Sequence, residues 1–144
     1  MIRQDRRLAQ VYALRTRRAE RERVEKLAEA ARSAARRQRA EHDRLIEADR
    51  RDAADLSLTA TPADPQVQLW RRVAGERLAQ ARQAENRAAA RLKESERDLE
   101  EARLRHERLV EREAWLSDRI ARKVTDQRHL RDERAVEEQA EARR

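Results

Sequence analysis

The stretch SLTATPADP, residues 57–65, contains both prolines of the chain together with two threonines and one serine. Residues that interrupt helices gather nowhere else in the chain. On either side the sequence is dominated by Ala, Arg, Glu and Leu, which favour helix. The sequence therefore predicts an all-α fold, in which a helix over about residues 3–57, a turn at about 58–64 and a helix over about 65–141 form one antiparallel coiled-coil hairpin, residues 1–144.

The start of the second helix is predicted from the same stretch. Pro65 disfavours the helical conformation at Asp64 and suits the first position of a helix, so Asp64 is the expected N-cap. Thr61, one turn earlier, is the alternative cap. Both choices break the chain at the same place.

The composition excludes several classes of function. With 45% charged residues the chain has too little apolar side chain for a compact globular core, and with no Cys it has neither disulfides nor thiolate metal ligands. Its three His are scattered, and its single Gly forms no phosphate-binding loop. We therefore expect no enzyme activity, no cofactor, no bound metal and no small-molecule substrate.

Apolar segments are short throughout the chain. None approaches the roughly 20 residues that span a bilayer, and the first ten residues, MIRQDRRLAQ, do not resemble a signal peptide. The sequence predicts a cytoplasmic protein without direct membrane insertion.

The second helix shows a clear heptad repeat with its a positions at 78, 85, 92, 99, 106, 113 and 120. The d positions hold small residues such as Ala81 and Ser95, which predict close approach of the helices. Glu85, Glu113 and Lys123 are charged exceptions within this seam. The large apolar residues predicted for the seam are Leu78, Leu92, Leu99, Leu109, Leu116 and Ile120.

The first helix has a less regular apolar pattern. If the chain folds back at about residue 62, Leu45 is expected beside Leu78, and Leu8 beside Leu116. The last 20 or so residues of the second helix would then have no partner within the chain, so they either fray or bind another molecule. The residues predicted for this side of the seam are Leu8, Val11, Leu14, Val24, Leu27, Ala31, Ala34 and Leu45.

Most of the net charge of +7 lies at the N-terminus, since residues 1–18 hold six Arg and one Asp. A hairpin brings these arginines close to those near residue 120. The cluster is either a solvated face or a site for an acidic protein surface. Nucleic acid suits it less well because acidic residues are interspersed. The candidate binding residues are Arg3, Arg6, Arg7, Arg15, Arg18, Arg119, Arg122 and Lys123.

Apolar residues near the turn form a second candidate surface: Leu56, Leu69, Trp70 and Val73. Trp70 either covers the turn against Leu56 or faces a partner. Trp115, next to the seam, is expected to stay partly exposed and is a candidate binding anchor.

The run LAQVYALRTRRAERERVEKLAEAARSAARRQRAEHDRL, residues 8–45, resembles the FliJ/YscO family of type III secretion stalk proteins. The break in mid-chain and the longer second helix are similar too. In that family the hairpin is a central stalk in a hexameric export ATPase, links the ATPase to the export gate at the inner membrane, and also binds export chaperones. The resemblance implies that the basic chain ends enter the ATPase ring and that the turn faces the gate.

Two other functions fit the same features. A structural coiled-coil scaffold predicts a stable homo-oligomer without an ATPase partner. A basic nucleic-acid-binding protein predicts affinity that falls steeply with salt.

Overall fold

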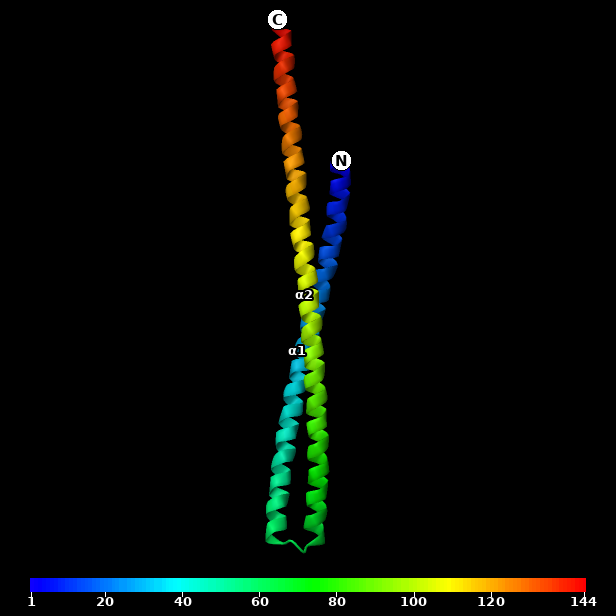
Figure 1. Ribbon diagram of the computed structural model, residues 1–144, viewed down its shortest axis with the longest axis vertical. Helices are drawn as coiled ribbons and strands as arrows, with labels where there is room; N and C mark the ends of the chain where they lie inside the picture. Colours follow the sequence, from blue (N-terminus) through cyan, green and yellow to red (C-terminus); the bar gives the residue numbers. More distant parts are fainter. The chain divides into compact units, whose positions relative to one another are not determined.

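The computed structural model describes residues 1–144 and contains two helices and no strands. Helix α1 spans Ile2–Ala60 and helix α2 spans Pro65–Ala142. The two helices pack against each other in opposite directions (Figure 1). The predicted all-α helical hairpin is confirmed.

The connection between the helices is shorter than the predicted turn. Helix α1 continues to Ala60, and the hydroxyls of Ser57, Thr59 and Thr61 donate hydrogen bonds of 2.9 to 3.0 Å to the carbonyls four residues earlier. At the start of α2, the Gln66 amide donates a 2.9 Å hydrogen bond to Asp64 Oδ1. Asp64 is thus the N-cap, as predicted, and Pro65 is the first helical residue.

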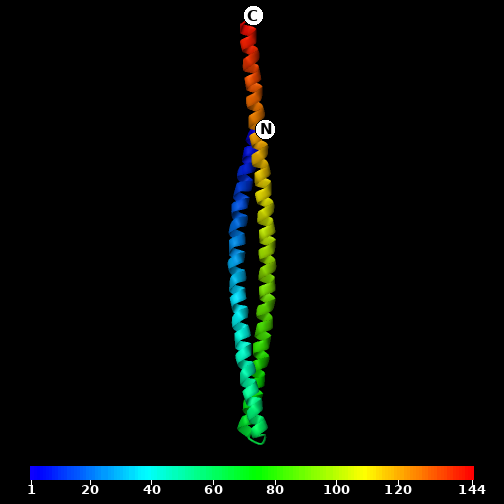
Figure 2. The ribbon, with the colours of Figure 1, turned by 90° about the vertical axis from the view of Figure 1, so that its left-hand side faces the viewer.

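The chain divides into two units, each made from a segment of both helices. The terminal unit comprises residues 1–23 and 101–144, and the hairpin unit comprises residues 24–100. Within each unit the segments of α1 and α2 lie side by side in the two views of Figures 1 and 2. The units are described separately below.

The face of α2 that contacts α1 follows the heptad positions read from the sequence. Every a and d position from Leu78 to Lys123 is buried or half-buried. Leu78 in the hairpin unit and Leu116 in the terminal unit are the most enclosed large side chains, at 4% and 1% exposed. Leu92, Leu99, Leu109 and Ile120 are half-buried.

The face of α1 that contacts α2 differs from the prediction. Its covered residues recur every three or four positions and are mostly small or polar. In the terminal unit they include Asp5, Tyr12, Thr16 and Ala19, and in the hairpin unit Lys26, Ala30, Ser33, Arg44, Arg51 and Ala54. The buried residues of α2 are mostly small as well, with Ala74, Ser95 and Ala102 beside Leu78 and Leu116, which allows the two helices to pack closely.

The seam predicted for α1 is wrong. From Val24 to Leu45, each predicted residue comes one position after a covered one, which places it about 100° around the helix. Leu27 is 52% exposed and Leu14 is 64% exposed, and Leu8 and Leu45 are exposed too. Apolar periodicity alone gives the wrong seam for α1, because many of the residues that face α2 are polar.

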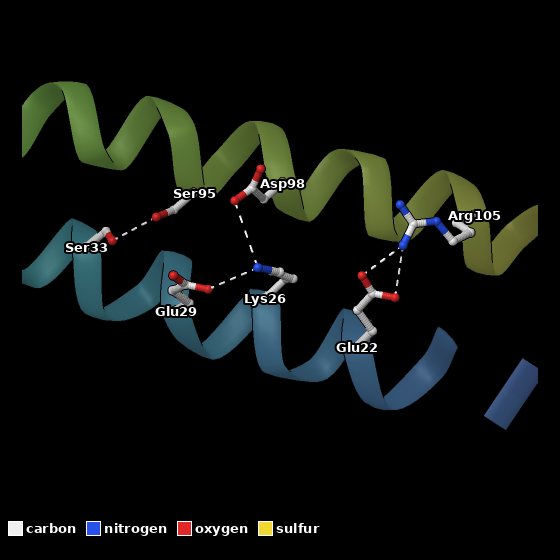
Figure 3. Close-up of polar contacts among 7 residues, drawn as sticks. All are labelled: Glu22, Lys26, Glu29, Ser33, Ser95, Asp98 and Arg105. Atoms are coloured by element: carbon white, nitrogen blue, oxygen red, sulfur yellow. Dashed lines mark hydrogen bonds and ion pairs between the residues drawn. The ribbon is translucent and has the colours of Figure 1, made fainter. Parts of the chain in front are cut away.

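Polar pairs between the helices explain this register. In the hairpin unit the Ser33 and Ser95 hydroxyls are 2.9 Å apart and Lys26 lies 3.9 Å from Asp98 (Figure 3). Arg44 pairs with Glu85 in the same unit. In the terminal unit Arg105 bonds to Glu22 at 2.8 Å, and Lys123 bonds to Asp5. Glu85 and Lys123 are thus paired seam residues, and their pairing opposes any shift of one helix along the other.

Gly75 is the only helical glycine, and there is room for a side chain at this position. A Cβ there would meet the Arg51 guanidinium at 3.4 Å, and no backbone atom of α1 is as close. Close packing therefore does not require glycine here, and glycine only weakens the helix.

We expect Gly75→Ala to raise the free energy of unfolding by roughly 0.5–1 kcal/mol. Urea denaturation of the full chain, followed by circular dichroism, measures the change. Ala79→Gly, at an exposed helical position four residues later, is the matched control and should lower stability by a similar amount. A destabilising Gly75→Ala would mean that Arg51 cannot move aside.

The buried Ser33–Ser95 pair offers a second test. Either single change to Ala removes one hydroxyl and leaves the other buried without its cross-helix partner, at a cost of about 1 kcal/mol. The double variant Ser33→Ala, Ser95→Ala should lose less than the sum of the singles, because no hydroxyl is left behind. Additive losses in the same denaturation measurement would show that the two hydroxyls do not interact.

Candidate protein-binding surfaces

The eight cationic residues predicted as a binding surface all lie in the terminal unit. We call them the basic terminal surface: Arg3, Arg6, Arg7, Arg15, Arg18, Arg119, Arg122 and Lys123. Seven of the eight side chains are exposed, and Lys123 is half-buried. Most of the basic terminal surface is therefore open to solvent.

Asp5 interacts with two cations of the basic terminal surface. Its carboxylate accepts a hydrogen bond from Lys123 and lies 3.7 Å from Arg119 Nε. The bond from Lys123 lowers the pKa of Asp5, partial burial opposes it, and the charges of Lys123, Arg119 and the amino terminus lower it further. Lys123 and Arg119 are thus occupied within the unit, whereas Arg3, Arg6, Arg7, Arg18 and Arg122 have no carboxylate within 4.0 Å.

Aromatic rings and arginines alternate on the same unit. The Arg112 guanidinium lies 4.5 Å from the centroid of the Trp115 ring, and that of Arg119 lies 5.3 Å from it. The Tyr12 ring has Arg15 at 5.6 Å and Arg112 at 5.9 Å. These are cation–π distances. Arg112, Trp115 and Arg119 follow helical spacing, so they form a ladder along one side of α2.

Trp115 remains 46% exposed although two arginines flank it. A shallow hollow of about 220 Å³ lies beside the indole, lined also by Asp118, Arg119, Arg122 and Lys123. An indole held between fixed cations is already ordered, so a partner that covers it loses little side-chain entropy. Trp115 was predicted as a candidate anchor, but Tyr12 was not, although its spacing from Arg15 could have indicated it.

The second predicted surface lies in the hairpin unit. Leu56 is 73% exposed, Leu69 and Trp70 are also exposed, and Val73 is half-buried. Beside them Arg71 Nε lies 2.6 Å from Asp55 Oδ1, and the Gln68 amide donates a 2.9 Å bond to the Pro62 carbonyl. These polar bonds hold the backbone near the turn, while the apolar side chains stay open to solvent.

A further apolar stripe lies on α1 of the hairpin unit and includes four residues predicted for the seam, Val24, Leu27, Ala31 and Ala34. It consists of Val24, Leu27, Ala28, Ala31, Ala34 and Ala35, and all six are exposed. They occupy adjacent positions on about three turns of helix. The large apolar residues of α1 are therefore available to a partner.

Groups suited to chemistry are sparse. No cluster of three or more His, Cys, Asp or Glu is placed to hold a metal ion. His106 Nε2 lies 2.8 Å from Glu20 Oε2. Glu20 also accepts hydrogen bonds from Arg23, and these bonds and the charges of Arg23 and His106 lower the pKa of Glu20.

Neither α1 nor α2 contains the length of apolar sequence that a membrane crossing needs. No protein-family model, curated protein or solved structure matches the chain.

The lowered pKa of Asp5 predicts a pH effect. Asp5 stabilises the fold when it is ionised, so its contribution is present above its ordinary pKa, near 4, and is lost as the pH falls through the lower pKa of the folded state. We expect Asp5→Asn to lower the melting temperature at pH 7, and the difference from the unchanged chain to shrink below about pH 4.

Thermal melts of both proteins between pH 2 and pH 7, followed by circular dichroism, give this comparison. Asp118→Asn is the control, since Asp118 is an exposed aspartate of the same unit without an ion pair. A difference between Asp5→Asn and the unchanged chain that stays constant with pH would contradict the ionic role of Asp5.

Proposed function

We propose that the chain is a protein-binding helical hairpin that serves as the stalk of a type III protein export apparatus. In this role the basic terminal surface contacts the inside of a hexameric export ATPase and stimulates it. The turn faces an export gate protein at the inner membrane, so the protein is cytoplasmic and peripherally associated with that membrane. Export chaperones are further partners.

The observation that carries the proposal is the position of the chain's large and charged side chains outside its seam. Leu8, Leu14, Leu27 and Leu45 face solvent, as do five unpaired arginines of the basic terminal surface. Exposed apolar residues on a helix pair, rimmed by charge, are typical of protein interfaces.

The chemistry of the basic terminal surface suits an acidic protein lining. Arginine donates paired hydrogen bonds to carboxylates and to backbone carbonyls, and such charge-assisted bonds are stronger than neutral ones. Trp115, held between Arg112 and Arg119, adds an apolar anchor beside these donors. The acidic residues around it, such as Asp118, disfavour a uniform polyanion such as nucleic acid.

The test is stimulation of the hexameric export ATPase from the same cells by the purified chain. The variant Arg6→Gln, Arg7→Gln, Arg15→Gln, Arg18→Gln should lose several-fold in stimulation while keeping its helix content, because these side chains are exposed. Trp115→Ala should weaken binding by roughly tenfold or more if Trp115 is an interface anchor.

The matched control removes four exposed arginines outside the basic terminal surface: Arg72→Gln, Arg82→Gln, Arg97→Gln and Arg108→Gln. It changes the net charge equally and should leave the stimulation near that of the unchanged chain. Equal losses in both variants would reduce the effect to net charge. Unchanged stimulation in the first variant would refute the role of these arginines, and failure of the unchanged chain to bind the ATPase would refute the stalk function.

A further inference from the structure

A groove lies between the two helices in the hairpin unit and is lined largely by arginine. Three hollows share Arg36 and together extend along residues 29–50 of α1 and 77–98 of α2. The middle hollow, of about 220 Å³, has Ser33, Ala84 and Ala88 among its lining residues, with Arg36, Arg87 and Arg91. The small side chains of α2 and Ser33 leave the space, and the three guanidinium groups make it cationic.

The arginines at the centre of this arginine groove have no acidic partner. No carboxylate lies within 4.0 Å of Arg36, Arg39, Arg87 or Arg91. Other arginines of the same unit do pair, as Arg44 does with Glu85. Four neighbouring guanidinium groups repel one another, so an anion that binds among them relieves that repulsion as well as making new bonds.

The charge along the arginine groove restricts the kind of ligand. Glu29, Glu94 and Asp98 line one end, and Asp43 and Glu47 lie with Arg39, Arg50 and Arg77 toward the other. Of these carboxylates, Glu94 and Asp43 form no ion pair within the chain. A uniform polyanion would therefore meet carboxylates on both sides of the central arginines. The groove runs beside 22 residues of α1, which is about 33 Å of helix. A helical segment with acidic residues at its centre and basic residues at its ends fits this pattern.

The chain itself contains such a segment. Residues 125–142 of α2, here called the overhang, are all exposed, and no ion pair joins them to α1. Figures 1 and 2 show α2 continuing alone beyond the N-terminus. Its charged residues begin with Asp126, Arg128 and Arg131, and Arg143 and Arg144 follow it. Between them lie Asp132, Glu133, Glu137, Glu138 and Glu141, interrupted by Arg134.

One face of the overhang carries the features that the arginine groove requires. Leu130, Glu133, Glu137 and Glu141 recur every three or four residues, so an exposed leucine and three carboxylates point the same way. Leucine suits the small-residue lining, and the carboxylates suit the arginines. The overhang is about 27 Å long, within the length of the groove.

We propose that the arginine groove of one copy of the chain binds the overhang of a second copy. The overhang cannot come from the same copy, because α2 is one uninterrupted helix and cannot fold its last turns back onto residues 77–98. The groove and the overhang use the same heptad positions of α2, d and g. These positions hold Ala84, Ala88 and Arg91 in the groove, and Leu130, Glu133 and Glu137 in the overhang. Each copy then binds the overhang of the other in its arginine groove, and these two equivalent contacts form a two-fold symmetric dimer. This self-association is separate from the stalk function proposed above.

Light scattering with size-exclusion chromatography and sedimentation velocity on the full chain test the proposal. Between about 1 and 100 μM we expect a shift from monomer to dimer that weakens at high salt, since the contacts are ionic. The overhang variant Glu133→Arg, Glu137→Arg, Glu141→Arg should raise the dimer dissociation constant at least tenfold. Its residues touch nothing within the chain, so it leaves the hairpin folded.

The groove variant Arg36→Glu, Arg87→Glu, Arg91→Glu should weaken the dimer to the same degree. The chain that combines both sets of changes should dimerise again, because the charges are exchanged between groove and overhang. Glu96→Arg, Glu101→Arg, Glu111→Arg changes the net charge by the same amount as the overhang variant, at exposed positions outside both surfaces, and is its control. A monomer at all concentrations, a dimer unaffected by either reversal, or no recovery in the combined variant would overturn the proposal.

Discussion

Close packing along a seam of mostly small side chains, with Leu78 and Leu116 as its largest buried residues, is the constraint on which the hairpin depends. Ala19, Ala30 and Ala54 on α1 are nearly inaccessible, as are Leu78 and Leu116 on α2. Burying a leucine stabilises a structure by about 1.5–3 kcal/mol, and the helices are too charged to gain much elsewhere. Each helix is therefore held mainly by its partner, and residues beyond the partner's reach gain no such support.

Polar residues within this seam determine its alignment. Glu85 and Lys123 interrupt the apolar repeat of α2, yet each has an opposite charge facing it, in Arg44 and Asp5. A shift of one heptad would bury these charges unpaired, which costs more than the seam gains from one additional apolar contact. The apolar contacts hold the helices together, and the polar pairs decide which residues meet.

The same alignment decides which surfaces are free for partners. Because α1 uses alanines, serine and charged residues toward α2, its leucines and valines lie outside the seam. Because neighbouring arginines of the hairpin unit lack carboxylates, they form a cationic groove. A helix pair with little core thus exposes several distinct surfaces, and its proposed partners are other proteins and a second copy of itself.

From the sequence alone, the two helices, the proline-containing break, the Asp64 cap and the heptad positions of α2 could be derived, since they follow from local backbone preferences and a regular repeat of period 3.5. The seam of α1 could not, because its small and polar residues have no apolar periodicity and its exposed Val24 and Leu27 mimic one. Only the tertiary structure decided that Lys123 and Arg119 pair with Asp5, that Arg112 and Arg119 flank Trp115, and that Arg36, Arg87 and Arg91 line one groove. These contacts depend on which face of each helix meets the other, and that choice is made by pairing across the whole interface, which no single segment specifies.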